Sequence, residues 1–209
     1  MNKLLILVVP LLMLAGCGGG ILDEKVADYD SLIESGWEKY NQYKYDAAYQ
    51  LFVSAKKQNS EGVEAHIGSG WSLLRRQHPD SAIVAFRTAF DYVVTLDDSV
   101  DTITGITGSY LARGDNSKVL DVFKKYLIES YEDIFPLKKH DFFIDESDLE
   151  IAQAMACYRL KLYSSTEIVD PDNALYHLNQ VLVTPASYID PETLLQSITD
   201  YIDDKGGDF

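Results

Sequence analysis

The four histidines are the residues best suited to acid–base or metal chemistry in this 209-residue chain. They are His66, His78, His140 and His177. No two of them have the i, i+4 spacing that would place a pair of imidazoles on one helix face, and there is no His-Glu-x-x-His motif. His177 falls on a predicted helix beside an inward-facing leucine, which is typical of a structural histidine. The sequence therefore predicts no catalytic histidine and no metal site.

Acids and glycines form two further patterns that resemble binding loops. The acidic run at 145–150 lacks the central glycine and the distal glutamate of a calcium-binding EF-hand loop. Acids there suit a helix N-terminus, where the helix dipole favours negative charge. The glycines at 18–20 have no preceding strand and no following Lys-Ser/Thr pair, so they do not fit a phosphate loop. We expect no cofactor, and we expect the protein not to be an enzyme.

The two cysteines have different predicted roles. Cys157 lies in an apolar helical stretch, and we expect it to be a buried, inert thiol. Cys17 follows Leu14-Ala15-Gly16 at the end of an apolar run that begins after Lys3. A positive start, a short apolar run and small residues form the pattern of a secretory signal. Residues 4–14 are too few to span a bilayer, which takes about 20 apolar residues.

The Leu-Ala-Gly-Cys ending resembles a bacterial lipobox. The resemblance implies a lipoprotein signal peptide over 1–16, lipid on the Cys17 thiol and acylation of the new N-terminus, for example by palmitate. The alternative is an ordinary signal peptide with a chance cysteine. Gly18 differs from the aspartate that retains lipoproteins in the inner membrane. The resemblance therefore implies an outer-membrane lipoprotein facing the periplasm, or the outer face of the plasma membrane in a single-membrane organism.

The charge of the chain after residue 16 excludes some partners. These 193 residues contain 17 basic and 33 acidic side chains, a net charge of −16. Such a charge repels the phosphates of nucleic acids and of anionic lipids. We therefore expect no nucleic-acid partner, and membrane contact only through the N-terminal lipid.

A 34-residue repeat runs along the N-terminal half of the chain. Eight residues within 33–55 recur without change within 67–89. This period is typical of a helix-turn-helix unit. The residues are Ile33, Ser35, Gly36, Trp37, Asp46, Ala48, Phe52 and Ala55, followed by Ile67, Ser69, Gly70, Trp71, Asp80, Ala82, Phe86 and Ala89.

The recurring residue types suit helices that pack against one another. A glycine such as Gly36 lets a neighbouring helix approach closely, and Phe52 and Ala55 share one helix face at i and i+3. Asp46 and Asp80 are predicted in the first turn of a second helix, where the dipole favours an acid. We therefore expect the phenylalanines to fill the space between consecutive hairpins.

These residues resemble the tetratricopeptide repeat family, and the Gly-Trp pairs resemble bacterial lipoproteins that carry such repeats. The family's usual tryptophan lies nearer the start of the first helix, where this chain has Leu32 and His66. The resemblance implies an all-α fold, an α-α superhelix of about four helical hairpins plus a C-terminal capping helix. It depends on Gly36, Gly70, Tyr45, Ala48, Ala82, Phe52, Phe86, Ala55 and Ala89.

Two further units and a cap follow. The third unit is displaced by three residues from the 34-residue period, and this slip falls near 97–99. The unit then turns at Gly114-Asp115. A capping box at 147–150 and Asp170-Pro171 begin the two helices of a degenerate fourth unit. Asp190-Pro191 begins the helix that would cover the open end of the solenoid. The inward-facing residues are Val119, Phe123 and Tyr126 in the third unit, Ala174, Leu178 and Val181 in the fourth, and Leu194, Leu195, Ile198 and Ile202 in the cap.

The predicted domain organisation follows from these patterns. It comprises the signal at 1–16, the lipidated cysteine and flexible tether at 17–28, three repeats at 29–130, an irregular connection at 131–146, and the fourth hairpin with the cap at 147–209. The connection contains Phe135, Phe142 and Phe143, which we expect to fold back onto the core. A partner-binding flap is the alternative for this segment.

In this family the first helices line the concave surface, so the resemblance implies a binding groove. The two first helices contribute i, i+3, i+4 sets, whose members share one face. Trp37 and Trp71 either receive apolar side chains of a bound peptide or fill the seam between consecutive first helices. We expect Tyr40, Asn41 and Arg75 to be exposed. The candidate groove residues are Trp37, Tyr40, Asn41, Trp71, Leu74 and Arg75, with Ile33 and Ile67 beside them.

The expected function is that of a lipid-anchored cell-envelope adaptor, which binds another envelope protein or peptide through this groove without catalysis. The alternative is a solute-binding envelope lipoprotein that holds a glycan or a peptide fragment between the groove aromatics. A third class, an envelope hydrolase, has no catalytic set to support it.

Overall fold

The computed structural model describes residues 28–126, 137–139, 142–144, 146–163, 173–182 and 190–204. The predicted signal peptide, Cys17 and the tether up to residue 27 lie outside these residues. So do Phe135, the dipeptide Asp170-Pro171 and the side chains of Phe123, Tyr126, Phe142 and Phe143, so the predicted return of the three phenylalanines at 135–143 to the core lies outside the described residues.

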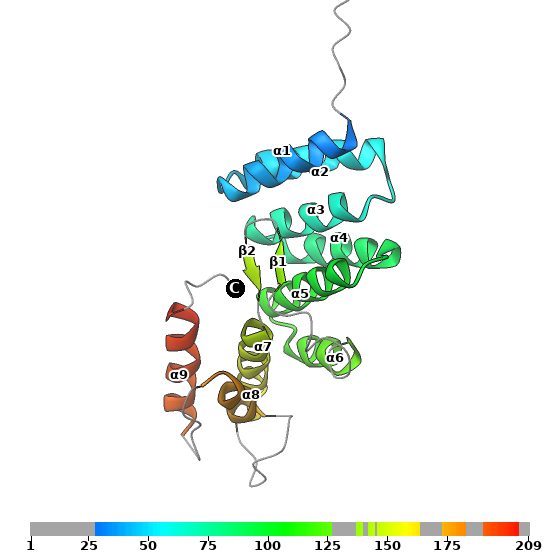
Figure 1. The fold of residues 1–209 in the computed structure, drawn as a ribbon. Coiled ribbons are helices and arrows are strands. Elements are labelled where there is room, and N and C mark those ends of the chain that lie inside the picture. Colours follow the sequence, from blue (N-terminus) through cyan, green and yellow to red (C-terminus); the bar gives the residue numbers. More distant parts are fainter. Residues whose placement is uncertain are drawn as a thin grey trace, which may run out of the picture.

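The described helices form consecutive pairs that stack into a superhelix (Figure 1). Each helix contacts the next one along the chain, and the first helices of successive pairs also contact one another. The all-α superhelix of four hairpins and a terminal helix is thereby confirmed. The pairs are α1 (Tyr29–Asn41) with α2 (Tyr45–Gln58), α3 (Val63–Arg75) with α4 (Pro79–Tyr92), α5 (Leu96–Arg113) with α6 (Asn116–Tyr126), and α7 (Glu146–Arg159) with α8 (Ala174–Val181), followed by α9 (Pro191–Asp204).

Along the chain, a small antiparallel β-hairpin comes between the third and fourth helix pairs. Strand β1 (Leu137–Lys139) pairs with β2 (Phe142–Ile144), and β1 contacts α5. The sequence predicted an irregular connection over 131–146. The residues described in that range instead form this strand pair, together with the first residue of α7. Three-residue strands are too short to produce a recognisable alternation of apolar and polar residues.

Several helix ends are where the residue types predict them. Asp28 caps α1, because its side chain accepts a hydrogen bond of 2.9 Å from the Ser31 amide. Pro79 is the first residue of α4, where its missing N–H leaves no helical hydrogen bond unmade. Gly114 ends α5 with a φ of +85°, a left-handed conformation that glycine adopts without a Cβ clash.

Other predicted boundaries differ from the structure. Helix α7 begins at Glu146, so the predicted capping box at 147–150 lies inside the helix. Asn173 caps α8 by accepting a 2.8 Å hydrogen bond from the Tyr176 amide, three residues after the predicted start at Asp170. Leu195 was expected in the buried stripe of α9, but 37% of it is exposed. The slip near 97–99 lies within α5, which has 18 residues where α1 and α3 each have 13.

Phe52 fills the space between the first and second helix pairs, as the sequence predicted. Its side chain is fully buried between two glycines, one on each neighbouring first helix. A Cβ at Gly36 would lie 2.6 Å from Phe52 Cε1, and one at Gly68 would lie 2.4 Å from it. Both distances are shorter than van der Waals contact, so only glycine fits on either side of the unshifted ring.

Phe86 repeats this arrangement between the second and third pairs. It is fully buried, with Gly70 on α3 and Gly105 on α5 against its ring. A Cβ at Gly70 would lie 2.7 Å from Phe86 Cε1, and one at Gly105 would lie 2.2 Å from Phe86 Cζ. The sequence pattern identified Gly36 and Gly70 but not the opposite glycines, Gly68 and Gly105.

A second core joins the last three helices. Leu178, Leu194 and Ile198 are fully buried there, and Cys157 is buried among them as predicted. Leu120 on α6 packs against both this core and the N-terminal core. None of the described helices is long and apolar enough to cross a membrane.

Candidate functional site

The two tryptophans of the predicted groove lie in the seams between first helices. Trp37 is 6% exposed and Trp71 is 7% exposed. The Trp37 ring packs edge-on against Phe52 at a centroid distance of 5.1 Å, and Trp71 against Phe86 at 5.4 Å. The sequence left two roles open for Trp37 and Trp71, binding a peptide or filling the seam between first helices. The structure shows that they fill the seam.

Each tryptophan also joins its helix to the next first helix by a hydrogen bond. Trp37 Nε1 donates to Glu64 Oε1 at 2.7 Å, and Trp71 Nε1 donates to Asp101 Oδ1 at 2.6 Å. The spacings along the chain are 27 and 30 residues, which differ by the three-residue slip in the repeat. The repeat pattern did not identify these acids, because Glu64 and Asp101 are different residues at unequal spacing.

A second pair of contacts links the repeats on the surface. Asp46 lies 2.6 Å from Arg76 Nε, and the corresponding Asp80 lies 2.9 Å from Arg113 Nη1. Both aspartates are in the first turn of a second helix, as predicted, and both arginines come at the end of the next first helix. Ion pairs this exposed are screened by solvent and add little stability, so their main consequence is to link each hairpin to the next in the same register.

Tyr40 is buried, which corrects the expectation that it is exposed. It is 7% exposed and packs edge-on against Trp37 and Tyr45, with ring centroids 5.4 and 5.2 Å away. Its hydroxyl accepts a hydrogen bond of 3.3 Å from Nε of the half-buried Arg75. Tyr40 and Arg75 thus connect the C-terminal ends of α1 and α3. Leu74 is half-buried, and of the residues expected to be exposed, Tyr40, Asn41 and Arg75, only Asn41 is.

Tyr40 predicts a measurable loss of stability at high pH. Burial raises its pKa to about 12, with Arg75 partly opposing the shift. Because this pKa lies above the ordinary 10.0, the neutral Tyr40 stabilises the fold fully below pH about 10, and this contribution is lost toward pH about 12. Urea unfolding across this range should show a shallower decline for Tyr40→Phe than for the wild type. An equal decline in both proteins would contradict the assignment.

The buried Trp71–Asp101 bond predicts a clear stability effect. Trp71→Phe removes the donor to a fully buried carboxylate, and we expect the free energy of unfolding to fall by about 1.5–3 kcal/mol. Trp37→Phe is the matched comparison, because Glu64 is only half-buried, and we expect a loss of about 0.5–1.5 kcal/mol. Urea denaturation at neutral pH measures both losses. A Trp37→Phe loss as large as that of Trp71→Phe would contradict the role of burial.

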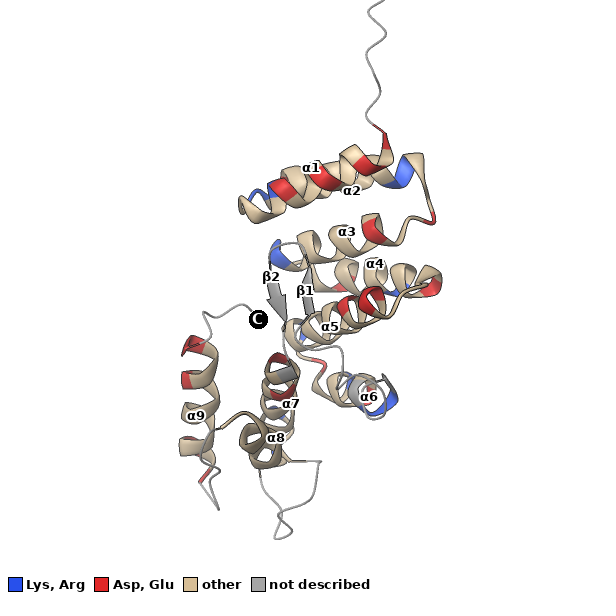
Figure 2. Cartoon of the chain, in the orientation of Figure 1, with Lys and Arg blue, Asp and Glu red and all other residues tan. Residues whose placement is uncertain are grey.

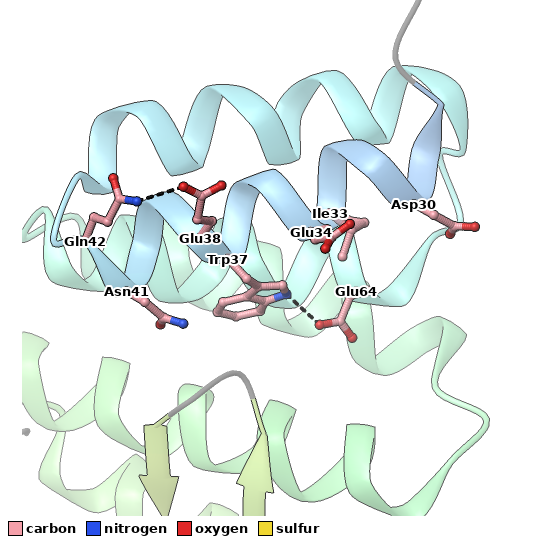
Figure 3. A pocket seen from close by; sticks show the side chains of 8 residues that line it. All are labelled: Asp30, Ile33, Glu34, Trp37, Glu38, Asn41, Gln42 and Glu64. Carbon is pink, nitrogen blue, oxygen red and sulfur yellow. Dashed lines mark hydrogen bonds between the residues drawn. The ribbon is translucent and has the colours of Figure 1, made fainter.

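An open pocket of about 710 Å³ runs along α1 (Figure 3). Its residues on α1 recur at every third or fourth position, so they form one continuous helix face, and Glu64 of α3 closes the opposite side. Trp37 and Glu64 meet at the floor of the pocket through their hydrogen bond. The pocket is lined by Asp30, Ile33, Glu34, Trp37, Glu38, Asn41, Gln42 and Glu64.

This pocket includes only part of the predicted groove. Trp37 and Asn41 line it, together with Ile33, whereas the other predicted residues do not. The sequence pattern did not indicate the carboxylates of the lining, because a single acid carries little information in a chain with 33 Asp and Glu residues. Their four-residue spacing at 30, 34 and 38 was the signal that could have identified them. The predicted groove residues outside the pocket are Tyr40, Trp71, Leu74 and Arg75.

A smaller pocket of about 280 Å³ lies between α4, α5 and α6. Its walls are mostly apolar side chains of the N-terminal core, with one arginine and one aspartate among them. It is lined by Arg87, Phe90, Asp91, Ile103, Ile106, Tyr110 and Val122.

The described residues include no cluster of three His, Cys, Asp or Glu side chains suited to a metal ion. His177 on α8 is 3% exposed, and its Nδ1 lies 2.6 Å from Glu150 Oε2 on α7, so it joins two helices as a structural histidine.

Comparison with other proteins adds no relative to this description. No protein-family model matches the chain, and neither a curated protein nor a solved structure does. A function for this chain must therefore be argued from its own sequence pattern and from the pocket along α1.

Proposed function

We propose that this chain is a lipid-anchored adaptor of the bacterial cell envelope that binds another protein through the α1 pocket and catalyses no reaction. The observation that carries the proposal is the pocket itself. Its volume of about 710 Å³ lies within the usual range for binding sites, and it follows a helix face in the manner of a peptide groove. Stacked helical hairpins commonly present extended binding surfaces of this kind.

The packing of the first two hairpins supports a tetratricopeptide-like repeat. In both, a small residue of the first helix meets a phenylalanine of the second, and buried alanines lie on the same face as that phenylalanine. These contacts involve the residues on which the resemblance depends, such as Gly36 with Phe52 and Gly70 with Phe86. We therefore retain the family as part of the proposal.

The lipid anchor rests on the sequence around Cys17. Asp28, the cap of α1, comes eleven residues after Cys17, and this length of chain reaches at most about 36–40 Å. The repeats would then lie close to the membrane, with α1 nearest along the chain. Gly18 favours the periplasmic side of an outer membrane in an organism that has two membranes.

Cys17→Ala is expected to abolish lipid attachment. Cells fed labelled palmitate should label the wild type and not the variant, and the variant should move from the membrane fraction to the soluble fraction. Cys157→Ala is the control, because the thiol at 157 is buried in the core and should not be acylated. Labelling of Cys17→Ala at the wild-type level would contradict the proposed anchor.

In-cell photocrosslinking tests the adaptor function. A photoreactive amino acid at position 41 should capture a partner protein, whereas the same group at position 84 should not, because Val84 is 65% exposed on α4 and lies outside the pocket. Reversing one pocket charge with Glu34→Arg should remove the adduct, and Glu61→Arg outside the pocket should leave it. Equal adducts at both positions, or none at position 41, would contradict the proposal.

The solute-binding alternative receives less support from the groove aromatics. Stacking on a sugar ring needs an exposed aromatic face. Trp37 and Trp71 are both buried, and their indole N–H groups already donate to carboxylates. A titration of tryptophan fluorescence with cell-wall fragments would separate the alternatives, since only the solute binder should respond.

A further inference from the structure

We infer that the α1 pocket takes a positively charged segment of the partner protein, one that carries Lys or Arg side chains. The inference rests on the proposed function and specifies the chemistry of the partner. It depends on the charge of the pocket, on the cost of that charge to α1, and on the apolar surface beside it.

The charge of the pocket has one sign. Asp30, Glu34 and Glu38 follow one another at four-residue intervals along α1, and Glu64 faces them from α3 (Figure 3). Among the described residues that line the pocket there is no Lys or Arg. Lys39 lies in the last turn of α1, and Lys44 Nζ donates to Gln42 Oε1 at 2.9 Å, so cations lie beside the C-terminal end of the pocket, and others occur at the ends of α2 and α3 (Figure 2). A cationic partner therefore gains most attraction along the part of the face that carries Asp30, Glu34 and Glu64.

This row of acids is unfavourable for α1 alone. Like charges four residues apart repel one another and destabilise a helix, and Glu34 has such a neighbour on each side. Among the described residues, no Lys or Arg forms an ion pair with Asp30 or Glu34, and Glu38 has only Lys39 at 3.7 Å. A bound cation would relieve this repulsion, so the arrangement favours a ligand of opposite charge.

The acids at 34 and 38 do not belong to the repeat. The corresponding positions one period later are Gly68 and Ser72, which are buried in the helix packing. Gly68 and Ser72 lie in the packing between hairpins, whereas Glu34 and Glu38 are exposed and no described element precedes α1 to cover them. These carboxylates are thus specific to the first hairpin.

The remaining lining suits the stem of a long cationic side chain. The half-buried Ile33 offers apolar surface between the carboxylates. Trp37 is 6% exposed and its N–H donates to Glu64, so it lines the pocket with little accessible surface and no donor for the ligand. Lys and Arg place their methylene groups on apolar surface while the charged head reaches a carboxylate.

Peptide binding to the full-length protein in detergent tests the inference. Three short fluorescent peptides share one Gly/Ser/Leu framework and carry Lys, Gln or Glu at the same positions. We expect only the Lys peptide to bind, with an affinity that falls as NaCl rises from about 0.05 M to about 0.5 M. Glu34→Gln/Glu38→Gln should weaken this binding about five- to thirtyfold. Glu61→Gln/Glu192→Gln, which removes equal charge outside the pocket, should leave it unchanged.

The outcomes separate this inference from the proposed function. The pocket variant should melt no lower than the wild type, because it loses repulsive charges and no packing contact, so weaker binding cannot be assigned to unfolding. Equal binding of the Lys and Glu peptides, or of the two double variants, would overturn the cationic partner and leave the adaptor function standing. If no peptide binds and position 41 crosslinks nothing in cells, both fail.

Discussion

Phe86→Ala is expected to lower the free energy of unfolding by about 3–5 kcal/mol. The ring is fully buried between Gly70 and Gly105 and packs edge-on against Trp71, so its removal leaves a cavity between the second and third helix pairs. Glycines on both sides have no side chains with which to fill that cavity. For a chain of this size we expect the midpoint of thermal unfolding to fall by roughly 6–20 °C.

Circular dichroism during heating measures this loss, and Val84→Ala is the control on the same helix. Val84 is 65% exposed on α4, so its truncation should change stability by no more than about 0.5 kcal/mol. If Phe86→Ala behaved like Val84→Ala, the phenylalanine between glycines would not be what holds consecutive hairpins together. The stacking on which the α1 pocket depends would then need another explanation.

Two glycines of α5 are expected to respond to the same substitution with opposite signs. A Cβ at Gly105 would lie 2.2 Å from the Phe86 ring, so Gly105→Ala forces the buried ring or the helix to move, at a cost of about 1–3 kcal/mol. A Cβ at Gly108 would meet only Leu74 Cδ2, at an ordinary 3.5 Å. Gly108→Ala should therefore stabilise the protein by up to about 1 kcal/mol through the higher helix propensity of alanine.

The difference between these two variants isolates the close approach of the helices, because helix propensity contributes equally to both. Chemical denaturation of the two proteins under one set of conditions measures it. We also expect Phe86→Leu to restore part of the loss in Gly105→Ala, since a smaller side chain makes room for the new methyl group. Equal effects at positions 105 and 108 would contradict the contact with Phe86.

The position of the pocket follows from this packing. Phe52 sets the distance between α1 and α3, and Trp37 bridges the two helices through its bond to Glu64. The corresponding bridge between α3 and α5 ends on Asp101, which is fully buried. Glu34 and Glu38 of the pocket lining have no acidic counterpart on α3, where positions 68 and 72 are Gly and Ser. One hairpin of a repetitive fold therefore presents a surface that the next does not.

The sequence alone was sufficient to predict the hairpins and the residues between them. The 34-residue period placed glycine, alanine and phenylalanine at positions that the structure confirms as buried contacts, and the three-residue slip recurs in the spacing of both the Trp–carboxylate and the Asp–Arg contacts. Such features are local and periodic, because each hairpin meets its neighbours through the same helix faces.

Only the tertiary structure determined the orientation of the tryptophans and the position of the pocket. Both depend on contacts between residues that differ from one repeat to the next. A period marks Trp37 and Trp71 as equivalent, but it does not say whether a ring points into a groove or into a seam. That depends on the size of Phe52 and Phe86 and on the acids opposite, Glu64 and Asp101. The β-hairpin and the charge of the pocket were likewise beyond the pattern, because the strand residues and the acids at 34 and 38 occur once rather than in every repeat.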